Sequence, residues 1–403
     1  MIVMIHFCAI KLESGKRNNN TLHYMLEQLK TGILGGGQLG AMLLRSAIDF
    51  GLNVSVMDKD PNAPCSRHTS SFKIGDPMNY DDVVKFGSNL DIITIEKEAV
   101  NTKALKHLQA NGVKVYPSPE TIEIIQNKYD QKQFLIKNEL PVAAGILVNG
   151  REEIMKHLDR LPACLKKCSH GYDGKGVMVL RTPEDIANAF DEPCVLEELV
   201  DIKHEISVIV SRNESGAIEC YDPVLMTFNK GRMILDFQMC PANIDVDIAM
   251  QTSNLAIKTA EALELVGIMA VEMFVDSHGN VVVNELAPRP HNSGHHTIEA
   301  NTTSQFEQQI RIILGLPLGS AKLNKASVMI NILEPVALRK NNQTDAINNI
   351  LCTDDAHLHW YGKHSGTEGR KMGHVTIVGS TIENALSKAV IIRHLLKGAY
   401  EEK

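Results

Sequence analysis

The sequence has 403 residues, of which 44% are hydrophobic and 22% are charged, a balance typical of globular proteins. Its net charge of −7 argues against a general nucleic-acid-binding surface and leaves room only for local basic pockets. No apolar run approaches the roughly 20 residues that a membrane span needs, and no second cysteine pair joins Cys164 and Cys168 to complete a zinc site. We therefore expect a reduced, cytoplasmic protein of about two to four domains, with neither nucleic-acid nor membrane partners.

The first residues carry no recognisable targeting signal. Residues 1–10 are apolar without a basic region, and residues 11–20 are polar without a small-residue cleavage pattern. We expect residues 1–24 to be a disordered extension or a misassigned start, with Met25 as an alternative start.

The pattern from Lys30 onward is strand, glycine-rich turn and helix. A strand at Thr31–Leu34 leads into Gly35–Gly40 and an apolar helix, and a second strand over 52–57 ends in Asp58. Glycines at a helix N-terminus let backbone N–H groups approach an anion, so this segment partly resembles a dinucleotide-binding fingerprint. The motif is weak alone, because similar turns bind other phosphates or no ligand.

The alternation of strand and helix continues toward a domain boundary. Four further segments are predicted, at 80–86, 91–95, 102–109 and 113–116. The second of these delivers Glu96 and Glu98 to a strand end, where open α/β sheets bind ligands, although exposed loop carboxylates would look the same. Ser118 followed by Pro119 predicts a helix start, and we place the boundary near it.

The middle of the chain carries lysines, glycines and an acidic pair. Lys128 lies on an amphipathic stretch, and a strand over 162–166 carries Lys166. The glycine-rich loop Gly171–Gly176 then precedes a strand over 177–180, and its N–H groups with Lys175 can close over a polyphosphate, or form only a β-turn. Glu197-Glu198 can bind an adenine amino group and ribose hydroxyls, or form a solvated corner.

A hairpin with paired carboxylates follows a helix predicted over 253–265. Glu272 lies in the first strand (271–275), and Glu285 lies just past the second (281–283). Folding back brings both carboxylates together, which suits Mg²⁺. A dense polar loop over 289–296 comes next, and a solvated hairpin is the alternative.

The remaining chain predicts a helix over 304–314, a β-rich run over 326–333 and a closing helix over 382–396. Lys363, Arg370 and Lys371 bracket a glycine-containing loop between them. Such a loop can grip a phosphate monoester, or be a solvated face.

Six segments, in this order, resemble the ATP-grasp ligases and, within them, the 5-(carboxyamino)imidazole ribonucleotide synthases of purine biosynthesis. They are GGGQLG (35–40), GYDGKG (171–176), ELAPRPHNSGHHT (285–297), SQFE (304–307), GLPLG (315–319) and RKMGH (370–374). The resemblance covers about Thr31 to the C-terminus. It implies an α/β ATP-grasp fold and a homodimer. The domains would be an N-terminal Rossmann-like (pre-ATP-grasp) domain, a central subdomain, a main subdomain and a small C-terminal β-rich domain, at 25–125, 126–200, 201–320 and 321–403.

The resemblance also implies a reaction and its site residues. ATP and bicarbonate would carboxylate the amino group of 5-aminoimidazole ribonucleotide through carboxyphosphate, with Mg²⁺ or Mn²⁺ on Glu272 and Glu285, and with Arg289 and Lys175 as catalytic residues. The implied ATP-binding residues are Lys128, Lys166, Gly171, Tyr172, Asp173, Gly174, Lys175, Gly176, Val177, Glu197, Glu198, Leu199, Val200, Glu205, Asn284 and Glu285. The implied substrate-binding residues are Gly37, Gln38, Leu39, Glu96, Glu98, His291, Asn292, Ser293, Lys363, Arg370 and Lys371.

The chain departs from the family pattern in four places. Ala41 stands where many relatives carry arginine, and Lys97 where they carry an apolar or aromatic residue. Residues 226–229 replace an Asn-x-His pattern with a segment ending in Asn229, and no additional arginine lies between Lys363 and Arg370. We interpret these as subgroup variation, because none removes a metal ligand or a triphosphate contact.

Three other functions remain open on the sequence. A formate-dependent glycinamide ribonucleotide transformylase shares a similar Pro-Arg-Pro-His opening but differs at residues 292–295. A non-catalytic ATP sensor would not require both hairpin carboxylates. A nicotinamide-dependent oxidoreductase explains only the first glycine turn.

Overall fold

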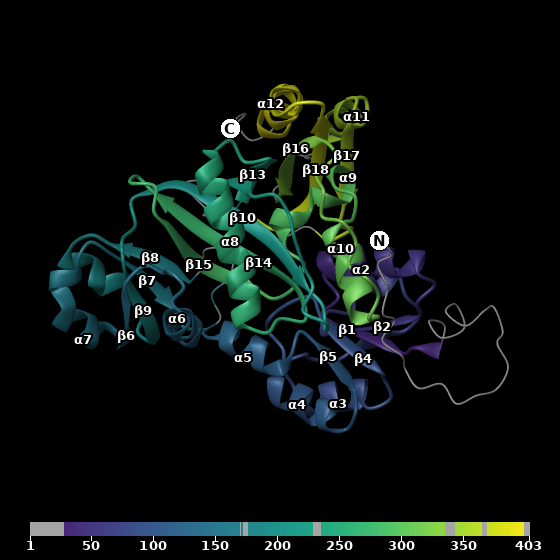
Figure 1. The fold of residues 1–403 in the computed structure, drawn as a ribbon, viewed down its shortest axis with the longest axis horizontal. Coiled ribbons are helices and arrows are strands. Elements are labelled where there is room, and N and C mark those ends of the chain that lie inside the picture. Colours follow the sequence, from purple (N-terminus) through teal and green to yellow (C-terminus); the bar gives the residue numbers. More distant parts are fainter. Residues whose placement is uncertain are drawn as a thin grey trace, which may run out of the picture.

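The computed structural model describes residues 28–169, 171, 176–228, 235–334, 343–364 and 369–398. The expected N-terminal extension, Tyr172–Lys175 of the second glycine loop, and Asn229 lie outside them. The described strands form three sheets, arranged side by side in Figure 1. No helix in these parts of the chain is long and apolar enough to cross a membrane.

The N-terminal sheet has five parallel strands in the order β3-β2-β1-β4-β5. They are β1 (Thr31–Leu34), β2 (Val54–Asp58), β3 (Phe72–Ile74), β4 (Ile92–Ile95) and β5 (Lys114–Tyr116). Helix α2 (Gln38–Asp49) shares one buried cluster with β1 and β2, while α3 (Tyr80–Gly87) and α4 (Thr102–Ala110) border another that contains residues of β4 and β5. This alternation of strand and helix confirms the Rossmann-like prediction.

Two helices link this domain to the next sheet. Helix α5 (Pro119–Gln126) begins as predicted, because the Ser118 hydroxyl accepts the Thr121 N–H at 3.2 Å. Helix α6 (Lys128–Lys137) follows, and its buried face holds Gln131 and Lys132 beside Leu135. The prediction of an amphipathic helix here is therefore wrong, because the buried face of α6 carries polar side chains that point into the site described below.

The central sheet is antiparallel, in the order β6-β9-β7-β8. Its strands are β6 (Gly145–Asn149), β7 (Ala163–Lys167), β8 (Val177–Leu180) and β9 (Pro193–Glu198). The short helix α7 (Arg151–Ile154) and two 3₁₀ turns, η2 (Met155–Arg160) and η3 (Pro183–Asn188), lie along it, and Val148, Leu165, Leu180 and Leu196 are fully buried in its core.

The large sheet runs in the order β15-β14-β10-β12-β13-β16-β18-β17, with β11 paired to β10. Its strands are β10 (Ile202–Arg212), β11 (Ile218–Cys220), β12 (Val224–Phe228), β13 (Leu235–Cys240), β14 (Gly267–Asp276), β15 (Val281–Ala287), β16 (Ala326–Leu333), β17 (Ala356–Trp360) and β18 (Lys371–Gly379). Strand β13 pairs with β16, so hydrogen bonding continues across the expected boundary at residue 320.

Helices cover the large sheet at both ends. Helix α8 (Val246–Ala262) packs on the β10–β14–β15 end, and α12 (Ile382–Gly398) with α11 (Gln343–Leu351) packs on the β16–β18 end. Helix α8 begins at Val246 and not at the predicted Ser253. The sequence conceals its first turns, because Val246 and Met250 are 73% and 59% exposed and give no buried periodicity.

Helix α10 (Gln305–Ile313) fixes the large sheet against the N-terminal domain. Its Phe306 and Ile310 are buried in one cluster with Leu39 and Leu43 of α2, and the two helices lie side by side in Figure 1. The segment before α10 contains the 3₁₀ turn η4 (Asn292–Gly294) and helix α9 (Thr297–Ala300). This packing holds the polar loop over 289–296 between the two bodies.

Candidate active site

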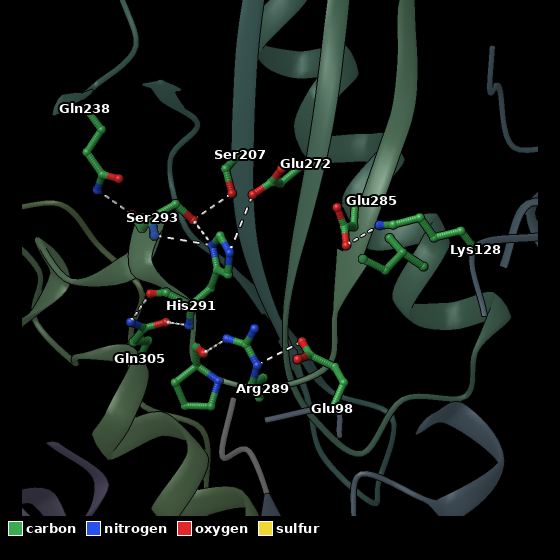
Figure 2. Close-up of polar contacts among 12 residues, drawn as sticks. Glu98, Lys128, Ser207, Gln238, Glu272, Glu285, Arg289, His291, Ser293 and Gln305 are labelled. Atoms are coloured by element: carbon green, nitrogen blue, oxygen red, sulfur yellow. Dashed lines mark hydrogen bonds and ion pairs between the residues drawn. The ribbon is translucent and has the colours of Figure 1, made fainter. Parts of the chain in front are cut away.

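The two hairpin carboxylates lie directly opposite each other. In the antiparallel pair of β14 and β15, Glu272 is in register with Glu285, and Ser207 of β10 continues the row on the other side of Glu272. Directly opposite residues project from the same face of a sheet, which brings the carboxylates together (Figure 2). Glu285 lies inside β15 and not past its end as predicted, because pairing continues through Ala287.

Glu205, Glu272 and Glu285, called here the carboxylate row, repel one another because they carry like charges. Burial, followed by repulsion from Glu285 and Glu205, raises the pKa of Glu272 to about 8. Burial raises the pKa of Glu205 to about 7. A nearby cation relieves such repulsion, and the Lys128 ammonium already lies 2.5 Å from Glu285 Oε1. His291 Nε2 lies 3.5 Å from Glu272 Oε1.

The donor set suits Mg²⁺ completed by substrate. No group of three or more histidine, cysteine or carboxylate side chains has the arrangement of a closed metal site within the described parts of the chain. Mg²⁺ is usually held by one or two carboxylates together with waters and substrate phosphates. Glu272 and Glu285 therefore fit as protein ligands for a metal that enters with a nucleotide.

A buried network of lysines lies beside the carboxylate row. Glu197 of β9 accepts ion pairs from Lys132 at 2.9 Å and from Lys166 at 2.7 Å, and all three side chains are at most 11% exposed. Lys166 also donates to Asn284 Oδ1 at 2.7 Å. Burial lowers the pKa of Lys132. Burial also opposes the charge of Lys166, but the charge and hydrogen bond of Glu197, together with Cys164 and Glu285, outweigh it and raise the Lys166 pKa.

Some of the predicted ATP-binding residues belong to this buried network and others lie outside it. Lys166, Glu197 and Asn284 meet directly, while the neighbouring Glu198 is exposed. Sequence reasoning missed Lys132. The signal was its place four residues after Lys128, on the same face of α6.

The first glycine turn uses its N–H groups within the protein. Gly36 N–H donates to Asp58 at 2.8 Å, and Gly40 N–H donates to Glu96 at 3.1 Å. A Cβ at Gly37 would lie 2.8 Å from a Glu96 oxygen, so glycine is needed for this close approach. Burial raises the pKa of Glu96, so its proton affinity is higher than that of an exposed carboxylate.

Asp58 is equally committed to the protein. It also accepts the Asp60 N–H at 3.0 Å and pairs with Lys97 at 3.0 Å. Burial opposes its charge, but the two N–H donors and Lys97 hold its pKa below the ordinary value. The acidic residue and two N–H groups of a dinucleotide fingerprint are thus occupied, which removes the basis of the nicotinamide alternative. This ion pair with Asp58 also explains why the chain carries Lys97 where relatives carry an apolar or aromatic residue.

Arg289 and His291 are aimed at the site from the loop after β15 (Figure 2). Arg289 Nε lies 2.8 Å from Glu98 Oε1, and its Nη1 donates to the Pro290 carbonyl at 2.9 Å. Gln305 holds His291 by both backbone groups, accepting its N–H at 2.9 Å and donating to its carbonyl at 2.7 Å. Gln305, which sequence reasoning did not select, therefore orients the ring that contacts Glu272.

The next two residues have different environments. The Ser293 hydroxyl is fully buried between Ser207 Oγ at 2.7 Å and His291 Nδ1 at 2.9 Å, so it braces the loop. The Asn292 amide is buried, and neither of its polar atoms has a hydrogen-bond partner among the described residues. A buried amide without partners is costly, so Asn292 is suited to a polar ligand.

A stack of three histidine rings connects this loop to the C-terminal strands. His295 lies 4.6 Å from His374 of β18, and His374 lies 4.4 Å from His359 of β17, measured between ring centroids. The Tyr361 hydroxyl is 2.7 Å from His374 Nδ1, and His359 Nε2 is 2.7 Å from Glu299. Burial lowers the pKa of His295 and His374 well below the ordinary histidine value, so both rings are neutral.

The basic loop, which Lys363, Arg370 and Lys371 bracket, lies between β17 and β18. Lys371 begins β18, and its charge acts on Glu272. Arg370 Nη1 donates to the His364 carbonyl at 3.0 Å, and Lys363 Nζ lies 5.5 Å from the centre of the Tyr361 ring. Long-range folding thus brings Lys371 toward the carboxylate row.

Three family models match successive parts of the chain. The ribonucleotide synthetase preATP-grasp domain matches residues 28–126, the ATP-grasp domain matches 133–306, and the phosphoribosylaminoimidazole carboxylase C-terminal domain matches 327–388. Together they confirm the ATP-grasp fold with its N-terminal and C-terminal domains.

Known proteins with this organisation are similar over nearly the whole chain. The N5-carboxyaminoimidazole ribonucleotide synthase of Bacillus subtilis is 36% identical over 353 residues, which cover 86% of this chain and 90% of the relative. An N5-carboxyaminoimidazole ribonucleotide synthetase in its ADP complex gives a TM-score of 0.85 at 34% identity, covering 93% of this chain and 99% of that one. The Aspergillus clavatus N5-carboxyaminoimidazole synthase with ADP and 5-aminoimidazole ribonucleotide gives 0.85 at 31% identity, covering 93% and 100%. The chain therefore belongs to the N5-carboxyaminoimidazole ribonucleotide synthase family of ATP-grasp enzymes.

Proposed function

We propose that this chain carboxylates the amino group of 5-aminoimidazole ribonucleotide, using ATP and bicarbonate and releasing ADP and phosphate. The observation that supports it most is the contact between the two halves of the site. His291, in the polar loop over 289–296, lies 3.5 Å from Glu272 of the carboxylate row, so a nucleoside triphosphate and a second substrate would meet at one point.

ATP would lie between the central and large sheets. Lys128 and Lys166 would contact its phosphate and adenine ends, and Glu197 favours the charged form of the Lys166 ammonium and holds it in place. Mg²⁺, held by Glu272 and Glu285, would draw negative charge away from the phosphates during transfer. Lys166 and Glu197 are at most 11% exposed, which strengthens the electrostatic contacts that they make.

The reaction would proceed by two displacements. A bicarbonate oxygen attacks the γ-phosphorus and the bond to ADP breaks, which gives carboxyphosphate. The exocyclic amine then attacks the carboxyl carbon, either of carboxyphosphate or of CO₂ released from it. Phosphate leaves, and it is the base that accepts the amine proton. Arg289, fixed by Glu98, would hold the doubly charged intermediate.

The imidazole nucleotide would lie along the loop and the first glycine turn. Its contacts would include Gly37, Gln38, Leu39, Glu96, Glu98, His291 and Asn292, with its phosphate on Lys363, Arg370 and Lys371. Ser293 would act indirectly, because its hydroxyl is committed to Ser207 and His291. We further propose a cytoplasmic homodimer, which sedimentation equilibrium can test.

One assay tests this function. Purified protein with ATP, Mg²⁺ and bicarbonate is expected to release ADP faster when 5-aminoimidazole ribonucleotide is added, with isotopic carbon from bicarbonate appearing in the product. Dependence on formate and glycinamide ribonucleotide would instead identify the transformylase alternative. Tight ATP binding without turnover would identify the sensor, and either result would contradict the proposal.

A further inference from the structure

Cations from two distant parts of the chain meet at the loop after β17. Arg67 ends the 3₁₀ turn η1 (Pro64–Arg67) of the N-terminal domain. Its Nη2 lies 3.5 Å from His364 Nε2, and its Nη1 lies 3.4 Å from the position of a Cβ on Gly362. Arg370 approaches the same residue, donating to the His364 carbonyl.

The turn that carries Arg67 is fixed to the first glycine turn. The Cys65 N–H donates to the Gly36 carbonyl at 3.0 Å, and the Cys65 Sγ lies 3.7 Å from the Gly37 carbonyl. Cys65 is fully buried, so η1 cannot move away from the glycine turn without exposing it. Arg67 therefore bridges the glycine turn and the basic loop.

Within the described residues, the charges of Arg67 and Arg370 are not balanced by carboxylates. No ion pair joins Arg67 or Arg370 to an acidic side chain in the part of the chain that the structure describes. Guanidinium groups that converge on one residue repel each other unless an anion lies between them. A phosphate monoester, with two negative charges and three acceptor oxygens, matches such paired guanidinium groups.

We propose that Arg67 binds the phosphate group of the nucleotide substrate, in concert with Arg370 and Lys363, and so selects the nucleotide over its nucleoside. This inference rests on the proposed function only for the identity of the substrate. Sequence reasoning placed the phosphate on the C-terminal loop alone. Arg67 adds a contact from the N-terminal domain, so that the phosphate would link the N-terminal domain to the C-terminal basic loop.

Steady-state kinetics of Arg67→Gln test the proposal. The variant is expected to raise KM for 5-aminoimidazole ribonucleotide by about tenfold or more, the usual weight of one charge-assisted contact. Its kcat should stay within about twofold, and KM for ATP should not change, because uniform binding of one substrate is lost. Arg67→Lys should recover part of the loss. Arg45→Gln removes an equal charge from the exposed face of α2 and should leave every parameter unchanged.

Ligand binding without turnover separates this inference from the proposed function. Calorimetry with ribose 5-phosphate and with ribose should show tighter binding of the phosphorylated sugar to the wild type, and Arg67→Gln should remove most of that difference. If 5-aminoimidazole ribonucleotide is not carboxylated but this difference is lost in the variant, the inference stands and the proposed function fails. If the wild type carboxylates its substrate while Arg67→Gln keeps both KM and the phosphate preference, the inference is wrong. Thermal melting verifies that the exposed substitution leaves the fold intact.

Discussion

Replacing Glu197 by glutamine should destabilise the protein more than any comparable change on the same strand. Glu197→Gln keeps the shape of the side chain but removes the charge that faces Lys132 at 2.9 Å and Lys166 at 2.7 Å. The three side chains are 8%, 6% and 11% exposed, so water cannot replace the lost partner. Breaking a buried ion pair from one side costs about 3–5 kcal/mol. Because the amide oxygen still accepts one hydrogen bond, we expect about 3 kcal/mol.

The assay is reversible urea unfolding, supported by thermal melting. For a cooperative unit of this size, each kcal/mol lowers Tm by about 2–4 °C, so Glu197→Gln should melt about 6–12 °C below the wild type. Glu198→Gln is the matched control, because Glu198 is the exposed neighbour on β9, and it should change stability by less than about 0.5 kcal/mol.

The origin of the loss can be checked by pH and by a second substitution. Burial already lowers the pKa of Lys132, and removing Glu197 should lower it further. The stability deficit of the variant should therefore shrink as pH rises toward the ordinary lysine pKa, where the buried ammonium becomes neutral. Adding Lys132→Met should restore part of the stability, because an apolar side chain needs no counter-charge. A Glu197→Gln protein that melts within about 2 °C of the wild type would refute the buried-network reasoning.

Three further substitutions test other parts of the site. Glu285→Ala should abolish ADP release in the turnover assay while far-UV circular dichroism and Tm stay close to the wild type, because the removed side chain is 45% exposed; near-normal activity would contradict the metal assignment. Arg289→Lys should lower kcat by more than about tenfold with KM for ATP unchanged, because lysine cannot reproduce a planar, fixed guanidinium; a change in KM alone would show that Arg289 only binds substrate. His296→Asn tests acid stability: burial lowers the pKa of His296 to about 4, so its contribution to the unfolding free energy is complete above pH 6.5 and falls by up to about 1.4 kcal/mol per pH unit below it. Urea unfolding at pH 7 and at pH 5 should therefore show that the wild type loses stability relative to His296→Asn as the pH falls. An equal difference at both pH values would contradict a buried, neutral His296 ring.

Features that depend on neighbouring residues could be predicted from the sequence. The strand, glycine turn and helix at the start of the first domain follow from local periodicity, and the helix cap at Ser118 follows from side-chain chemistry. The carboxylate pair could also be predicted, because a hairpin brings Glu272 and Glu285 together over a few residues. The start of the first strand, at Gly267, and the end of the second, at Ala287, were misjudged.

Contacts between distant segments could not be predicted from local patterns. Lys166 and Asn284 are 118 positions apart, and the pairing of Lys132 with Glu197 requires α6 to pack against β9 of the central sheet. The commitment of Glu96 to a backbone N–H was equally hidden, because a carboxylate at a strand end looks the same whether it faces a ligand or the protein.

The first glycine turn illustrates why the function had to be decided elsewhere in the chain. Its glycines look like an anion site in sequence, yet Asp58 and Glu96 already accept two of its N–H groups. Those bonds fix the turn in place, and the N–H groups of Gly36 and Gly40 are not available to bind an anion. Under the proposed function the chemistry comes from the carboxylate row, where a metal and phosphates would relieve the repulsion that raises the pKa of Glu272. His291 joins that row to the loop held by Gln305, so we propose that one imidazole ring couples the binding of the two substrates.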